Sequence, residues 1–280
     1  MRKSMLTLMY ITNNPEVAQI AQKAGVDRIW VDMEYIGKED RQGGMDTVKN
    51  HHTIRDVEKL ITVVTTSKLM VRINPIHDKT DEWLGTEEEI EQTIRAGADV
   101  IMLPYFKTAE EVKRFVHAVR GRATTMLLVE TNEAVKHLDE ILDVPGIDEV
   151  HIGLNDLHLC RGQKFMFELI CDGTVQEICK KVHSKGIKYG FGGIARIGLG
   201  TLPAEYVIAE HYALGSTAAI LSRSFCAANT AAHPADVEQT FVDGVRKIRE
   251  KEVEVAQYTQ EQYAENFREI TRRVDAIIHQ

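Results

Sequence analysis

The chain has few cysteines, no cluster of basic residues and no long hydrophobic run. Its four cysteines include no CxxC pair, so reduced thiols are expected rather than a disulfide framework. Acidic residues outnumber lysine and arginine by 42 to 34, and without grouped basic side chains no nucleic-acid partner is expected. The apolar run at residues 5–11 is too short for a signal peptide, and no run approaches a membrane helix of about 18 residues. These absences predict a cytoplasmic protein without a membrane segment.

What the chain does contain is enough apolar material for one large core. Of its 280 residues 44% are hydrophobic, and a (β/α)8 barrel usually takes about 250 residues. Short apolar runs alternate with amphipathic ones, which is typical of βα units. Eight runs are predicted strands, at residues 4–11, 28–33, 69–74, 100–104, 125–130, 149–155, 188–192 and 218–222. The sequence therefore predicts an α/β fold, a (β/α)8 TIM barrel over residues 1–230, with a C-terminal helical extension at residues 231–280.

The C-terminal extension has a charged, helical pattern. Hydrophobic residues recur four, three, four and three positions apart near its end, at Tyr263, Phe267, Ile270, Val274 and Ile277. This spacing is that of an a/d seam, which needs a surface to pack on. We predict that a second copy of the chain supplies that surface in a homo-oligomer; packing on the chain's own barrel is the alternative.

Two acidic residues each end a predicted strand on either side of one helix-sized segment. Glu130 follows the apolar run 126–129, Asp156 follows residues 150–155, and the segment between them ends at Pro145. A right-handed crossover would place the two strand ends side by side. Two carboxylates can then hold one hard cation, which keeps positions open for water and substrate oxygens. The sequence predicts a divalent-metal site on Glu130 and Asp156; the alternative is that they only cap a helix and open a turn.

The residues around this pair carry a family resemblance. They read Leu-Leu-Val-Glu-Thr at 127–131, Asp-Glu-Ile-Leu-Asp-Val-Pro-Gly-Ile-Asp-Glu-Val at 139–150 and Ile-Gly-Leu-Asn-Asp-Leu at 152–157. Here the chain strongly resembles the HpcH/HpaI aldolase and citrate lyase beta-subunit family, and it does so more loosely over residues 28–104. The resemblance implies a metal-dependent barrel that makes or breaks a carbon–carbon bond beside a 2-oxo acid. It places the metal, Mg2+, Mn2+ or Co2+, on Glu130 and Asp156. The preceding residues Gly153, Leu154 and Asn155 are candidate substrate contacts.

Two further residues at predicted strand ends are candidates for catalysis. Arg72 lies within an apolar strand, where an unpaired guanidinium is costly and a planar fork suits a carboxylate or enolate oxygen. The resemblance gives Arg72 that role; the alternative is that it only neutralises nearby acids. Glu34, in Asp32-Met33-Glu34, matches the family's Asp-Leu-Glu phrase and would hold a metal-bound water or orient Arg72. Asp32 is interpreted as a structural acid at the strand end.

The chain departs from the family's pattern where the proton relay is expected. Tyr35 stands where the aldolase branch has a histidine and the lyase branch an aspartate, and Leu128 replaces a glutamine. The long loop at residues 35–52 offers substitutes, among them Lys38 and His52. We predict that His52 transfers the proton, since imidazole titrates near neutral pH; a solvated or helix-capping histidine is the alternative.

A second polar group follows the last two predicted strands. Gly192 and Gly193 come after the seventh strand and Arg223 after the eighth, in the quarter where barrels frequently bind phosphate. These three residues are predicted to bind an anionic part of the substrate. Alternatively, the glycines only permit a tight turn and Arg223 is surface charge.

Together these residues predict a metal-dependent aldolase or carbon–carbon lyase. In this hypothesis the ion chelates the carboxylate and carbonyl of pyruvate or a related 2-oxo acid while Arg72 stabilises the enolate. The alternatives are an acyl-CoA lyase of the citrate-lyase type, an enzyme that uses phosphoenolpyruvate, and a barrel that binds a metabolite without catalysis.

Overall fold

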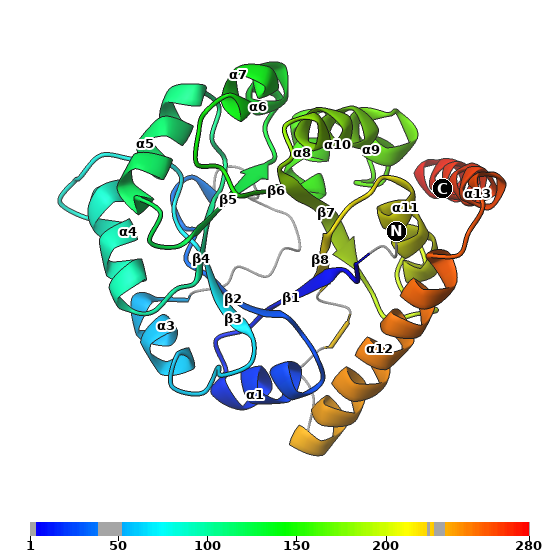
Figure 1. Cartoon of the computed structure of the whole chain (residues 1–280), viewed down its shortest axis with the longest axis horizontal. Coiled ribbons are helices and arrows are strands. Elements are labelled where there is room, and N and C mark those ends of the chain that lie inside the picture. The colour runs from blue at the N-terminus through cyan, green and yellow to red at the C-terminus, as the bar shows by residue number, and fades with distance from the viewer. Residues whose placement is uncertain (1–3, 39–51, 223–224, 227–232, 280) are drawn as a thin grey trace.

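A computed structural model describes residues 4–38, 52–222, 225–226 and 233–279. Eight parallel strands close into a barrel in chain order, with the last strand paired to the first (Figure 1). The strands are β1 (Thr7–Ile11), β2 (Arg28–Asp32), β3 (Lys68–Arg72), β4 (Val100–Leu103), β5 (Thr124–Val129), β6 (Glu149–Ile152), β7 (Lys188–Ile194) and β8 (Ala218–Leu221). The predicted TIM barrel is confirmed.

Helices surround the barrel and cover its outer face (Figure 1). They are α1 (Pro15–Lys23), α3 (Ile54–Leu60), α4 (Thr86–Arg95), α5 (Ala109–Val119), α6 (Asn132–Lys136), α7 (Leu138–Leu142), α8 (Leu154–Cys160), α9 (Glu168–Cys171), α10 (Thr174–Ser184), α11 (Ala204–Ala213), α12 (Pro234–Val255) and α13 (Gln260–Ile278). Local sequence explains several starts. Asn14 caps α1 by accepting the N–H groups of Glu16 and Val17, and Thr108 and Glu111 form a capping box on α5. Helices therefore begin where the capping residues predict.

All eight predicted strands are present, but several end earlier than predicted. The sixth strand ends at Ile152 rather than at residue 155, because Gly153 becomes the N-cap of α8 and Leu154 its first residue. The seventh strand instead continues to Ile194. After β6 the apolar residues continue into α8, and at the end of β7 they continue through a bulge. Hydropathy alone therefore cannot locate the end of either strand.

The barrel encloses a hydrophobic interior, closed at the amino ends of the strands by a buried ion pair. Inward-facing side chains form one cluster, made of Met9, Trp30, Met70, Val100, Met102, Met126, Leu128 and Ala218. Below it, Arg28 of β2 crosses to Glu149 of β6 in a fork of two 2.7 Å hydrogen bonds. Both residues are 8% exposed. The packed interior leaves only the carboxyl ends of the strands for a site.

Helix α12 fastens the start of the first strand. Glu252 of α12 is fully buried; its Oε1 accepts the N–H of Leu6 (2.6 Å) and the hydroxyl of Tyr212 (3.2 Å). Arg249 donates to the second carboxylate oxygen at 2.7 Å. The extension is therefore bonded into the barrel rather than loosely attached to it.

The hydrophobic seam of α13 packs on the chain's own barrel. Tyr263, Ile270 and Val274 are buried, Phe267 is 36% exposed, and α13 packs against α11 and α9 (Figure 1). This contact satisfies the predicted seam without a second copy. The homo-oligomer stays a prediction that the seam itself does not require.

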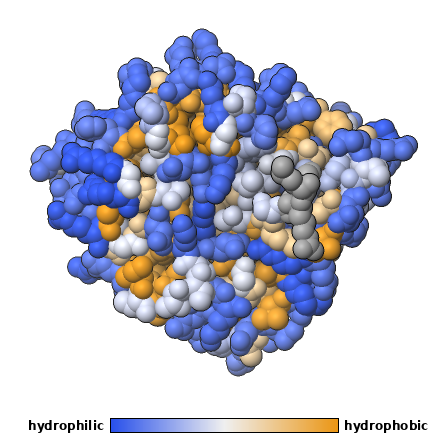
Figure 2. Space-filling model, viewed as in Figure 1, coloured by the Kyte–Doolittle hydropathy of each residue, from blue (hydrophilic) through white to orange (hydrophobic). Residues whose placement is uncertain are grey.

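The face of the molecule seen along the barrel axis is mostly polar. Figure 2 shows hydrophilic residues over most of the face seen along the barrel axis, with hydrophobic residues in separate patches. In the described parts of the chain no helix combines the length and apolar character needed to cross a membrane. The cytoplasmic location stays a prediction.

A buried carboxyl group at the inner face of α11 gives the fold a pH dependence. Glu210 is 4% exposed, and among the described residues its Oε2 has no hydrogen-bond partner. Burial raises its pKa from 4.5 to about 7, and the amide of Asn266 on α13 opposes the shift only in part. The folded protein therefore keeps this proton at a pH where the unfolded chain has released it.

We expect Glu210→Gln to remove part of the pH dependence of stability. A pKa that is higher in the folded state means that the free energy of unfolding falls as pH rises from about 4.5 to about 7, by roughly 3 kcal/mol. Urea denaturation of wild type and variant across this window measures the effect. Glu250→Gln, at an exposed ion pair with Arg246, is the control. Equal slopes in wild type and Glu210→Gln would contradict the prediction.

Candidate active site

Glu130 lies at the carboxyl end of β5, directly after its last residue. Its side chain is 3% exposed, and Oε1 accepts the backbone N–H of Tyr105 at 3.0 Å. Tyr105 has a left-handed backbone with φ of 49°, a conformation that is strained for a residue with a bulky side chain. The strained turn after β4 thus aims an amide at the Glu130 carboxylate and fixes it at the barrel mouth.

Gly153 is the neighbour of Glu130 on the adjacent strand end. Its N–H donates to the carbonyl of Val129 at 2.9 Å, which extends the pairing of β5 and β6. A Cβ at this position would lie 2.8 Å from Oε2 of Glu130. Glycine is required here for space, since its φ of −81° is open to any residue. The structure places this predicted substrate contact against the Glu130 carboxylate.

Asp156 lies in the first turn of α8, one turn beyond the strand end where the sequence predicted it. It is 9% exposed, and its Oδ1 accepts the side-chain amide of Asn155 at 3.0 Å. A carboxylate is favoured in this first turn by the helix dipole. The side chain of Leu154 belongs to the hydrophobic core, and the residue is 1% exposed. The substrate contact predicted for Leu154 therefore remains a prediction that concerns its backbone atoms.

Two carboxylates converge on Arg72 at the end of β3. Nε and Nη2 of Arg72 each lie 2.7 Å from an oxygen of Asp32, and Nη1 lies 3.3 Å from Oε2 of Glu34. The guanidinium also stands over the ring of Trp30, 5.1 Å from its centroid. Asp32, interpreted from sequence as a structural acid, is therefore the main partner of Arg72, and Glu34 is the weaker one.

The charges of this group reinforce one another. Burial alone would raise the pKa of Asp32, but Arg72 and Lys38 outweigh it and hold that pKa well below its usual range. Burial would lower the pKa of Arg72, whereas Asp32, Glu34 and, more weakly, Glu130 raise it well above its usual value. Arg72 is thus a permanent cation. It interacts electrostatically with the carboxylates of Asp32 and Glu34 and, more weakly, with that of Glu130.

Lys38 is a member of this group that sequence reasoning did not single out. Its Nζ lies 2.9 Å from Oδ2 of Asp32 and 3.8 Å from Oε2 of Glu34, and the residue is only 7% exposed. In the sequence it is one of several charged residues in a polar loop. Its spacing of four residues from Glu34 was the available signal, and it is a weak one because such pairs are common on exposed surfaces.

His52 and Tyr35 are brought to the same strand end. The backbone N–H of Asp32 donates to Nδ1 of His52 at 3.1 Å, and the Tyr35 hydroxyl donates to the His52 carbonyl. Since Nδ1 accepts a hydrogen bond, the neutral ring carries its proton on Nε2. Burial, followed by the charges of Asp32 and Asp56, raises the pKa of Tyr35, so the phenol that replaces the family histidine stays protonated.

The predicted anion group is only partly described. Gly192 and Gly193 lie inside β7 at an irregularity in its pairing with β8. The carbonyl of Gly192 is 3.1 Å from Nε2 of His151, and a Cβ there would lie 2.7 Å from Cδ1 of Leu154. A left-handed backbone with φ of 49° and close packing against Leu154 together explain the glycine at position 192. Arg223 lies outside the described residues, and anion binding by these three residues stays a prediction.

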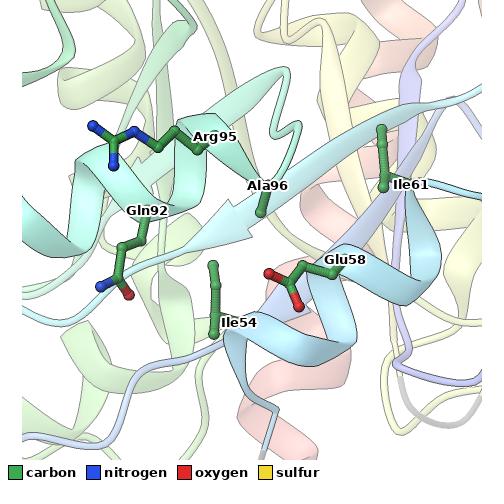
Figure 3. A pocket seen from close by; sticks show the side chains of 6 residues that line it. All are labelled: Ile54, Glu58, Ile61, Gln92, Arg95 and Ala96. Carbon is green, nitrogen blue, oxygen red and sulfur yellow. The ribbon is translucent and has the colours of Figure 1, made fainter.

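Two cavities in the described part of the chain lie away from these side chains. One, of about 390 Å³, lies between α3 and α4 on the outside of the barrel (Figure 3) and is lined by Ile54, Glu58, Ile61, Gln92, Arg95 and Ala96. The other, also of about 390 Å³, lies between the loop after β7 and α12, and its lining includes Arg196, Asp236, Asp243 and Lys247. The candidate active site is therefore defined by its chemistry and its place in the barrel.

Two residues at the mouth have the ligand type of a hard divalent cation. Glu130 and Asp156 supply carboxylate oxygens, the ligands that such ions prefer, and glycine at 153 lets the Glu130 carboxylate lie where a Cβ would come within 2.8 Å of Oε2. Within the described ranges, no group of three or more His, Cys, Asp or Glu side chains is arranged to hold a metal. An ion here would rest on two protein carboxylates and complete its shell with water and substrate oxygens.

Known proteins share this fold. An HpcH/HpaI aldolase from Desulfitobacterium hafniense DCB-2 superposes with a TM-score of 0.59 at 18% identity, covering 88% of this chain and 93% of that one. The citrate synthase SbnG superposes with a TM-score of 0.60 at 18% identity, covering 84% and 94%. At such identities the structural likeness shows the fold alone.

Sequence comparison is more specific. A 2-keto-3-deoxy-L-rhamnonate aldolase of Escherichia coli O9:H4 (strain HS) is 26% identical over 176 residues, covering 52% of this chain. The chain spans 58% of the length of that relative. The family model for HpcH/HpaI aldolase/citrate lyase matches residues 6–165, which include Arg72, Glu130 and Asp156. The chain belongs to the HpcH/HpaI aldolase/citrate lyase family.

Proposed function

We propose that this protein is a divalent-metal-dependent aldolase or carbon–carbon lyase that works through the enolate of pyruvate or a related 2-oxo acid. The placement of Arg72 supports this most, because Asp32 fixes the guanidinium while Glu130 acts on it electrostatically. A cation on Glu130 and Asp156 would supply the Lewis acidity that polarises a substrate carbonyl. Mg2+ and Mn2+ suit two carboxylates best, and Co2+ is the third candidate.

Arg72 is built to stabilise an oxyanion. Asp32 engages Nε and Nη2, so the guanidinium is oriented before substrate arrives. Nη1, which lies 3.3 Å from Oε2 of Glu34, has the longer contact and is the nitrogen proposed to meet the substrate. Negative charge that develops on an enolate oxygen is stabilised most by donors that need no reorganisation. The ring of Trp30, 5.1 Å from the guanidinium carbon, attracts the cation and helps to hold it in place.

His52 holds a proton at a defined atom. With Nδ1 accepting from Asp32, proton transfer by this ring takes place at Nε2, which is a donor in the neutral form. In this tautomer His52 would donate a hydrogen bond from Nε2–H to a substrate oxygen, and the proton transfer predicted for it would require the ring to take up a second proton first. Tyr35, bonded to the His52 carbonyl, holds the segment that carries this ring.

Exchange of the methyl protons of pyruvate for deuterium in D2O, followed by NMR, tests the proposal. Exchange is expected with Mg2+, Mn2+ or Co2+ and should stop on chelation, because enolate formation removes a methyl proton. Exchange that persists without metal would contradict the metal dependence. Absence of exchange under every condition would contradict the pyruvate proposal and direct the search to thioester or phosphoenolpyruvate substrates, or to metabolite binding without catalysis.

Arg72→Lys is expected to slow this exchange by about 100-fold, because a lysine ammonium cannot bind Asp32 through two parallel hydrogen bonds and still present a donor to the substrate. The exchange rate at saturating pyruvate measures the effect. Arg114→Lys is the matched control, since Arg114 forks onto Glu87 at 2.6 and 3.0 Å on the outer surface. Equal rates in Arg72→Lys and the control would exclude the proposed role.

A further inference from the structure

One amide side chain fastens the segment after β2 to the end of β3. Asn74 lies just beyond β3 and is 4% exposed. Its Oδ1 accepts the backbone N–H of Tyr35 at 2.8 Å and that of Ile36 at 3.0 Å. Both N–H groups belong to a turn at residues 35–38, which the N–H of Lys38 closes by donating to the carbonyl of Tyr35 at 3.1 Å. We call this segment the β2 turn.

The contact stands in for the next hydrogen bond of the β2–β3 pairing. The N–H of Met33 donates to the carbonyl of Arg72 at 2.9 Å, and in a regular parallel pair the N–H two residues later would reach the main-chain carbonyl of residue 74. The side-chain oxygen of Asn74 accepts that N–H instead, together with the following one. The conformation of the β2 turn thus depends on a side chain, which a single substitution can change.

Glu89 of α4 orients the amide of Asn74. Its Oε1 accepts Nδ2 of Asn74 at 2.9 Å and the main-chain N–H of Asn74 at 3.2 Å. Because Nδ2 is the donor and Oδ1 the acceptor of an amide, only this orientation satisfies both the carboxylate and the two N–H groups of the turn. Helix α4 is therefore linked through Asn74 to the β2 turn.

The β2 turn is joined to two contacts of the candidate active site. Directly before it, Oε2 of Glu34 lies 3.3 Å from Nη1 of Arg72. Within it, the hydroxyl of Tyr35 donates to the carbonyl of His52. Movement of the turn would displace both contacts, because Glu34 is one peptide bond away and Tyr35 is part of the turn. Displacements of about 1 Å in such positions can slow catalysis by as much as about 100-fold.

We propose that Asn74 is a positioning residue that holds the β2 turn, and with it Glu34 and Tyr35, in place for catalysis. Glu89 contributes by fixing the orientation of the Asn74 amide. Asn74 acts through these neighbours and not on the substrate. The hold on the turn stands on the hydrogen bonds alone, whereas its effect on catalysis rests on the proposed function.

Amide hydrogen exchange, followed residue by residue by NMR, tests the hold on the turn. In Asn74→Ala the N–H groups of Tyr35 and Ile36 lose this acceptor and are expected to exchange at least about tenfold faster than in wild type. The N–H of Met33, which donates to a backbone carbonyl, should keep its wild-type rate. Unchanged protection at Tyr35 and Ile36 would overturn the proposal.

Asn74→Asp makes the contact with Glu89 one between two carboxyl groups. The new carboxylate can still accept both N–H groups, but it can lie against Glu89 only while the two share a proton. Burial already raises the pKa of Glu89 against the hydrogen bonds of Asn74 and the charge of His77. Deuterium exchange into saturating pyruvate is therefore expected to be about tenfold slower than in wild type at pH 8, with a smaller deficit at pH 6.

Reversing the two side-chain types should rescue the variant. In Asn74→Asp/Glu89→Gln the glutamine can donate to the new carboxylate and accept the main-chain N–H of position 74, and the net charge equals that of wild type. The rate is expected to return to within about threefold of wild type at both pH values. Glu88→Gln, at an exposed contact with Gln92 on the same helix, is the control and should match wild type. A deficit in Asn74→Asp that is equal at both pH values and is not rescued would overturn the positioning role.

Failure of the proposed function is a separate outcome. If wild type exchanges no deuterium into pyruvate, the amide exchange of Tyr35 and Ile36 still decides whether Asn74 holds the turn. If Asn74→Ala exposes both N–H groups without slowing pyruvate exchange, the role in catalysis is excluded. If Asn74→Ala does not fold, the other variants decide: a double variant that folds at pH 8 where Asn74→Asp does not supports the pairing with Glu89, and two variants that unfold alike overturn it.

Discussion

Glu130→Gln is expected to slow metal-dependent deuterium exchange into pyruvate by about 1,000-fold or more, because loss of a carboxylate ligand forfeits several kcal/mol of charge stabilisation. An amide keeps the shape of the side chain, and its oxygen can still accept the N–H of Tyr105. The fold should therefore be retained, as the thermal unfolding midpoint will show. Titration of free Mn2+ by electron paramagnetic resonance should show weaker binding in parallel with the slower exchange.

The control for this variant is Glu133→Gln. Glu133 is exposed in the first turn of α6, three residues from Glu130, and its substitution also removes one negative charge. Both exchange and Mn2+ binding should match wild type. Retention of Mn2+ affinity in Glu130→Gln would show that the ion is held elsewhere, and the assignment of Glu130 as a ligand would then fail.

Arg28→Met is expected to lower the free energy of unfolding by about 3–5 kcal/mol, because it leaves the carboxylate of Glu149 buried without its partner. Arg28 and Glu149 close the amino end of the barrel through two hydrogen bonds of 2.7 Å. Because Glu149 is only 8% exposed, its carboxylate cannot reach water in the variant without a costly rearrangement. Urea denaturation at neutral pH measures the loss.

Two companion variants identify the cause of that loss. Arg28→Met/Glu149→Leu replaces both charges by apolar groups and should recover most of the stability, since a buried ion pair is often matched by well-packed hydrophobic residues. Arg246→Met breaks an exposed pair with Glu250 and should cost no more than about 1 kcal/mol. A double variant as unstable as Arg28→Met would mean that the loss comes from packing.

The fold and part of the site could be predicted from the sequence because their signals are local. Eight apolar runs at barrel spacing predict eight strands, and the positions of Arg72 and Glu130 follow from where two of those runs end. The ends of strands are harder to predict than their presence. Leu154 is apolar and so resembles a strand residue, yet it is the first residue of α8. Asp156 was consequently placed at a strand end although it lies on α8.

The partnership of Asp32 with Arg72 and Lys38 could not be read from the sequence. Asp32 and Arg72 are 40 positions apart, and only the pairing of β2 with β3 makes them neighbours. Nothing in a single strand indicates that Asp32 is the nearer partner of the arginine and Glu34 the more distant one. Lys38 had only the weak signal of its spacing from Glu34, since its burial depends on the fold of the loop and not on its flanking residues.

The bond between Leu6 and Glu252 also bears on how the chain is made. The two residues are 246 positions apart. At a synthesis rate of roughly 5–20 residues per second, Glu252 is added roughly 12–50 s after the strand whose start it binds. Until β8 follows, β1 is an open sheet edge on a growing chain, and such an edge readily pairs with other chains. The barrel therefore reaches its closed form only late in synthesis, and the nascent chain is most prone to aggregate before β8 has left the ribosome.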